Sequence, residues 1–152
     1  PPRGERGEGL DGRAGVVLEG VVLAELAVLR LAQAVERQEV DDLEAGVAWY
    51  GRLAGERTSL QPNYPIDLAA QLKAPVLGLY GGQDQGIPLA DVETMRAALA
   101  AAKQSSEIVV FEGAPHGFHA DYRPSFRAQD AEDAWRQCLA WFRKHGVGQG
   151  VG

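Results

Sequence analysis

The chain has 152 residues, of which 45% are hydrophobic and 24% charged, a composition typical of one globular domain with its own core. Its 15 basic and 21 acidic side chains give a net charge of -6, which argues against nucleic-acid and membrane-surface partners. The single cysteine excludes an internal disulfide, and because neither a long uncharged apolar segment nor a signal-peptide pattern is present, we expect a cytoplasmic protein.

The first 44 residues divide into two segments of different composition. Residues 1–15 are rich in glycine, proline and charged side chains, which predicts a disordered lead-in. From Val16 to about Arg37 aliphatic residues recur at helical spacing and predict a helix of roughly five turns. We treat residues 16–44 as an aliphatic helical segment whose origin the sequence leaves open.

The remainder of the chain, residues 45–146, has the pattern of an alternating α/β protein. Short apolar runs without polar alternation predict buried strands at residues 45–51 and 75–80, and residues 106–111 are predicted to form a third strand. The expected fold class is therefore α/β, with about three parallel strands, right-handed crossovers and flanking helices. Residues 147–152 are expected to form a flexible tail.

Two helices are predicted between and after these strands. The first runs from Pro88 to Lys103 and has Val92, Met95, Leu99 and Ala102 along one side. The second runs from about Ala131 to Lys144, and its predicted inward residues are Ala131, Trp135, Cys138, Leu139 and Phe142.

Asp84 and His116 follow the ends of two successive predicted strands. Because ligands of a parallel sheet gather beyond the carboxyl ends of its strands, we expect both side chains at one rim. A carboxylate there would fix the imidazole tautomer and stabilise the imidazolium during proton transfer. Taken singly, each residue is more typical of an ordinary polar loop, and the pairing at successive strand ends is what favours function.

Four segments together resemble a known family. They are AGVAWYGRLAG, PIDLAAQLKAPVLGLYGGQDQGIP, EGAPHGFHADYRPSFRAQDAEDAW and CLAWFRKHG, and they include a G-G-x-D and a P-H-G-F motif. Over residues 45–146 the chain is similar to the carboxyl-terminal part of the dienelactone hydrolases, or carboxymethylenebutenolidases. The resemblance implies part of an α/β-hydrolase fold that opens ester or lactone bonds through a cysteine or serine, without metal or cofactor. By position it makes Asp84 the triad acid and His116 the triad base.

The nucleophile of that family has no counterpart in the expected place. Its elbow, G-x-C-x-G-G, precedes the strand that matches residues 45–51, whereas residues 1–57 contain no serine, threonine or cysteine. We considered Asp11, Ser59 and Cys138 as substitutes, but none has the strand-turn-helix context of an elbow. We interpret residues 1–44 as a frame-shifted or fused segment rather than the family's amino-terminal half.

Three further residues are candidates for substrate binding. Tyr50 and Tyr122 are expected to wall a pocket, and Arg123 to meet a substrate carboxylate. The spacing of His116 and His119, with Asp121 nearby, resembles metal ligation, but the loop lacks regular structure to set the ligands, so we predict no metal.

Two hypotheses of function remain open. The first is a hydrolase acting on a small-molecule ester or lactone, with Asp84 and His116 as its base system and a nucleophile from elsewhere. The second is a non-catalytic remnant or interaction module that keeps the back half of the fold. A three-stranded half sheet would also expose one strand edge, which leaves open self-association there, cover by the helix of residues 16–37, or marginal stability.

Overall fold

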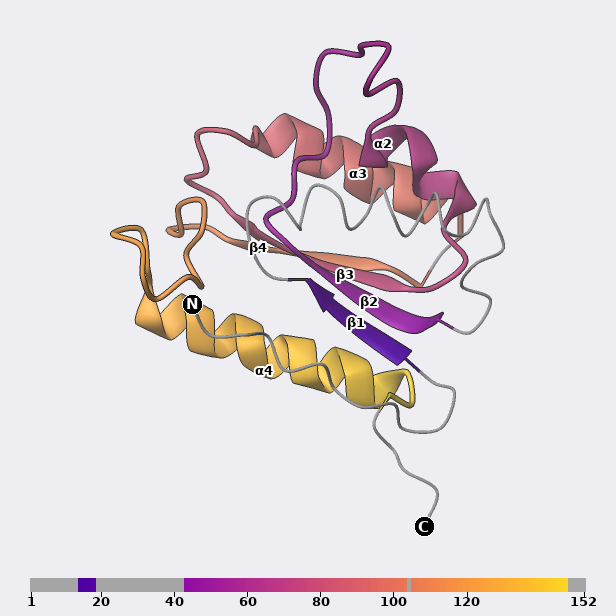
Figure 1. The fold of residues 1–152 in the computed structure, drawn as a ribbon. Coiled ribbons are helices and arrows are strands. Elements are labelled where there is room, and N and C mark those ends of the chain that lie inside the picture. Colours follow the sequence, from indigo (N-terminus) through magenta and orange to yellow (C-terminus); the bar gives the residue numbers. More distant parts are fainter. Residues whose placement is uncertain (1–13, 19–42, 104, 148–152) are drawn as a thin grey trace.

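The computed structural model describes residues 14–18, 43–103 and 105–147. Its elements are β1 Ala14–Leu18, β2 Leu43–Trp49, α2 Pro65–Leu68, the 3-10 turn η1 Ala69–Gln71, β3 Val76–Gly81, α3 Leu89–Ala101, β4 Glu107–Phe111 and α4 Ala128–Lys144. Figure 1 shows three layers, with α2 and α3 on one face of the sheet and α4 on the other. Because helices cover both faces of the sheet, its central strands are buried on both sides and their sequences are continuous apolar runs. In β3 every residue is buried.

The sheet has four parallel strands in the order β1-β2-β3-β4. Strands β2, β3 and β4 confirm the three parallel strands predicted from the apolar runs. The register pairs Trp49 with Leu79 and Gly81 with Phe111, so the strands end at the same edge of the sheet. The loops that follow β2, β3 and β4 therefore lie at the same edge of the sheet.

The prediction for the start of the chain was wrong where the structure describes it. Residues 14–18 form β1, which pairs with β2 in parallel, instead of the end of a lead-in and the first turn of a helix. A short run containing two valines fits either periodicity, and backbone pairing with β2 decides between them. The rest of the predicted lead-in and helix, residues 1–13 and 19–42, and the tail at 148–152, lie outside the described residues.

Helix α4 packs on the sheet through a different stripe from the one predicted. Its buried residues are Ala131, Ala134, Cys138, Trp141 and Phe142. Trp135 and Leu139, predicted to face inward, are 41% and 36% exposed. The Trp135 ring instead stacks at the loop end of the helix, 5.9 Å from the His119 ring and 6.4 Å from the Trp49 ring. Within the described residues, no helix is long and apolar enough to cross a bilayer.

Two glycines at the end of β3 permit a close approach of the loop that follows β4. A Cβ placed on Gly81 would collide with the carbonyl oxygen of Ala114, and one on Gly82 would lie 2.6 Å from the carbonyl oxygen of Glu112. Both neighbours are backbone atoms, which cannot move aside as a flexible side chain would. Glycine at these two positions therefore allows the loop after β3 and the loop after β4 to lie in backbone contact.

We expect Gly81→Ala to lower the free energy of unfolding by about 3 kcal/mol, because overpacking against backbone forces the loops apart. Gly113→Ala is the matched control, since a Cβ there meets nothing within 4 Å. It should change the free energy of unfolding by less than about 1 kcal/mol. Urea unfolding of both variants provides the measurement, and equal effects would contradict the close-approach account.

Candidate active site

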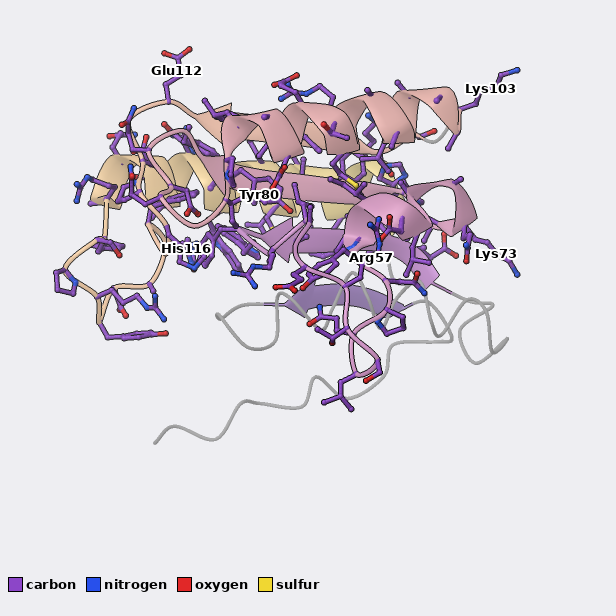
Figure 2. The ribbon with its side chains drawn as sticks, turned by 90° about the horizontal axis from the view of Figure 1, so that it is seen from above. Arg57, Lys73, Tyr80, Lys103, Glu112 and His116 are labelled. Carbon is purple, nitrogen blue, oxygen red and sulfur yellow. The ribbon has the colours of Figure 1, made fainter. Side chains whose placement is uncertain are left out.

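The loops after β3 and β4 meet at the carboxyl edge of the sheet. In Figure 2, Lys73 and Lys103, which precede these strands, lie at one end of the molecule, and His116 and Glu112 lie at the other. The loops are joined by main-chain and side-chain hydrogen bonds. Gln83 N donates to the Ala114 carbonyl at 3.0 Å, and Gln83 Nε2 donates to the Glu112 carbonyl at 3.2 Å. The two loops therefore form one connected surface.

Asp84 is fixed by the backbone of its own turn. Its Oδ1 accepts hydrogen bonds from Gly86 N at 2.8 Å and from Ile87 N at 3.0 Å. The carboxylate side chain has no exposed surface, and two backbone donors replace part of the water that it loses on burial. The second oxygen, Oδ2, is left to face the other loop.

His116 forms a hydrogen bond with that second oxygen. Its Nδ1 lies 2.6 Å from Asp84 Oδ2 although the residues are 32 positions apart in the sequence. An ionised carboxylate only accepts hydrogen bonds, so the imidazole donates from Nδ1 and its Nε2 carries the lone pair when the ring is neutral. The His116 side chain is 31% exposed, which makes the ring accessible from solvent. The predicted neighbourhood of Asp84 and His116 is thus present in the structure.

Tyr80 shows that the surroundings of Asp84 are poorly solvated. Burial raises the pKa of the Tyr80 phenol well above its ordinary value, and the negative charge of Asp84 raises it further. The phenol therefore stays protonated and adds no second negative charge beside the carboxylate.

A cavity of about 450 Å³ opens beside the pair. Its lining residues are Arg52, Gln83, Asp84, Gln85, Gly86, Ile87, Pro115 and His116. The volume suits a small organic molecule. Arg52 and the two glutamines were not among the residues predicted from the sequence, although Arg52 follows the first predicted strand directly and so belongs to the same rim.

Tyr50, which directly follows β2, has an unusual backbone conformation. Its φ is 36°, in the left-handed region that side chains other than glycine rarely adopt. Its ring is 2% exposed and meets the His116 imidazole edge to face, with 5.1 Å between ring centroids. The predicted wall residue is therefore packed against the histidine.

The strain at Tyr50 can be measured by removing its side chain in two ways. Tyr50→Ala keeps the unfavourable φ, whereas Tyr50→Gly relieves it, and both lose the ring. We expect the glycine variant to be more stable than the alanine variant by about 1 kcal/mol in urea unfolding. An alanine variant of equal or greater stability would show that the backbone there is not strained.

The other two predicted binding residues lie in different surroundings. Tyr122 is 75% exposed and lines a second cavity, of about 570 Å³, together with Trp135 and Asp121. Arg123 lies across Gly117, where a Cβ would be 3.1 Å from Arg123 Cδ. Gly117 has a φ of 73°, so it provides both the turn and the space for this side chain next to His116.

The side chains considered as alternative nucleophiles either do not line the cavity at the pair or lie outside the described part. Cys138 is buried on α4, beneath the sheet, and Ser59 lies on the loop between β2 and α2. Asp11 lies outside the described residues. Among the residues that the structure places, no three His, Cys, Asp or Glu side chains are grouped to hold a metal ion.

Comparison with known proteins identifies a family model and close relatives that agree with each other. The profile of the "Dienelactone hydrolase family" matches residues 30–146, so the similarity begins before Ala45, where the sequence resemblance placed its start. A "Putative carboxymethylenebutenolidase" from Methylorubrum extorquens is 56% identical over 105 residues, 69% of this chain and 36% of that protein. A protein of the same name from Escherichia coli K12 is 54% identical over 68% of this chain and 38% of its own length. The chain thus spans little more than a third of these relatives.

A more distant relative and two solved structures extend the comparison. A "Probable 2-oxo-3-(5-oxofuran-2-ylidene)propanoate lactonase" from Bradyrhizobium is 31% identical over 70% of this chain and 44% of that protein. The crystal structure of a "Putative Dienelactone Hydrolase" from Klebsiella pneumoniae superposes with a TM-score of 0.76 at 43% identity, covering 86% of this chain and 51% of the other. An acylaminoacyl peptidase from Pyrococcus horikoshii, at 16% identity and a TM-score of 0.66 over 86% of this chain and 24% of its own, shares the fold alone.

Proposed function

The chain belongs to the dienelactone hydrolase family, and on that premise we propose that it carries the acid and base of an enzyme that hydrolyses esters or lactones. The observation that carries the proposal is the 2.6 Å contact between Asp84 Oδ2 and His116 Nδ1 beside an open cavity. An exposed imidazole oriented by a buried carboxylate is the arrangement needed for general acid and base catalysis.

In the proposed reaction His116 Nε2 takes a proton from the nucleophile as that group attacks the carbonyl carbon. Asp84 stabilises the imidazolium that forms, since its charge lies at Nδ1 and is shielded from water. The imidazolium then gives the proton to the departing alkoxide, and the same residues activate water to release the acyl group. In the first half of the cycle the proton passes from the nucleophile through His116 to the alkoxide, and in the second half it passes from water through His116 back to the nucleophile.

We propose that the nucleophile is supplied from elsewhere and not by this chain. Residues 1–57 contain no serine, threonine or cysteine, so the family's usual attacking side chains are absent from the stretch that ends with the first residues after β2. Cys138 is fully buried on α4, and its thiol belongs to the core.

The substrate proposed is a small molecule, because the cavity next to His116 holds about 450 Å³. Arg52, Gln83 and Gln85 line it and carry hydrogen-bond donors suited to the oxygens of an ester or lactone. The lactonase named among the relatives favours the same substrate class.

The missing hydroxyl and thiol side chains favour a second candidate. In this candidate the chain is a non-catalytic module that keeps the fold's back half and associates through a sheet edge. The Asp84–His116 pair would then be retained for structure alone.

Cleavage of p-nitrophenyl acetate separates the two candidates. Turnover of this ester by the purified chain above the rate of free imidazole at equal concentration, reduced by about 10²-fold or more in His116→Ala, would favour the hydrolase. Because this chain has no counterpart of the family's nucleophile elbow, we expect it to be nearly inactive on its own. His145→Ala is the matched control, because His145 follows the far end of α4 and packs on Trp141, with 4.4 Å between the rings. It should leave the rate unchanged. A wild-type rate equal to that of free imidazole supports the non-catalytic candidate.

A further inference from the structure

We propose that Tyr50 is a positioning residue that holds the His116 imidazole in the plane where Nδ1 meets Asp84. This inference rests on the proposed function, since it names a residue that prepares the base of the same site. Tyr50 acts through His116 and not on the substrate, because its side chain is only 2% exposed.

One hydrogen bond leaves a histidine ring with freedom to turn. The contact between Asp84 Oδ2 and His116 Nδ1 holds one ring atom, but coupled changes of χ1 and χ2 can still tilt the imidazole while Nδ1 stays within hydrogen-bonding distance. A second contact is required to fix the plane of the ring. The Tyr50 ring supplies it, lying 5.1 Å from the imidazole centroid at an interplanar angle of 64°.

The Tyr50 ring is itself held from two sides. Phe118, on the same loop as His116, meets it edge to face with 5.7 Å between centroids, and Trp49 meets it in the same way at 6.4 Å. Phe118 and Trp49 are both fully buried, so these contacts belong to the rigid core. The imidazole is thus connected to the core through Tyr50.

The backbone at Tyr50 places the ring where it is needed. Tyr50 N donates to the Leu79 carbonyl at 2.7 Å, which continues the pairing between β2 and β3 up to this residue. At that point φ turns to 36°, and the next residues, Gly51 and Arg52, leave the sheet toward the cavity. A strained conformation of a non-glycine residue persists where the surroundings enforce it, and such residues cluster at functional sites.

The test uses nuclear magnetic resonance of the whole chain, labelled with 15N at histidine, under alkaline conditions where the imidazole is neutral. In the wild type we expect cross-relaxation between Tyr50 ring protons and the His116 ring, and nitrogen shifts of a single tautomer protonated at Nδ1. Tyr50→Phe keeps the ring and should keep both signatures. Tyr50→Leu removes the ring and should give shifts of mixed tautomers.

Tyr64→Leu is the matched control, because Tyr64 is also buried but packs on Gly55 in the loop between β2 and α2. It should leave the His116 tautomer unchanged. If Tyr50→Leu does not fold, the wild-type cross-relaxation and the Tyr50→Phe spectrum still decide. Absence of that cross-relaxation, or a single Nδ1 tautomer in folded Tyr50→Leu, overturns the inference. These readouts need no turnover, so they separate failure of this inference from failure of the proposed hydrolase function.

Discussion

The candidate site depends on the parallel pairing of β3 and β4. That pairing sets Gly81 opposite Phe111, so the two loops that follow leave the sheet side by side. Only then do Asp84 and His116 come within hydrogen-bonding distance, at 2.6 Å. A slip of the register by one residue would reverse which faces the side chains occupy and would separate the loops. The chemistry of the site is thus a property of the sheet.

The loops add three constraints to what the strands provide. Glycines after β3 allow backbone to lie against backbone, the turn of Asp84 fixes its carboxylate, and Gly117 makes room for Arg123 beside the histidine. Tyr50 contributes from β2, so three consecutive strands of the sheet each send a residue to the site. Because several rigid elements hold the histidine, its ring is already oriented for proton transfer before the reaction begins.

The sequence predicted the parts of the fold that follow from strong local patterns. Fully buried strands read as uninterrupted apolar runs, and the rim rule for parallel sheets then placed Asp84 and His116 together. Residues 14–18 were misassigned because their pairing with β2 is a tertiary effect. Trp135 was misassigned because stacking with His119, which periodicity does not reveal, draws its ring to the loop end of α4. Arg52 and the conformation of Tyr50 depend on how the chain leaves β2, which no motif reports.

Neutron diffraction from crystals of the chain tests the central claim most directly, because it locates the proton between Asp84 and His116. The account predicts a proton on His116 Nδ1 directed at Asp84 Oδ2, with the two heavy atoms less than about 3 Å apart. It also predicts an Nε2 open to the cavity. A proton on Nε2 alone, or a separation of Nδ1 and Oδ2 beyond about 3.5 Å, would contradict it.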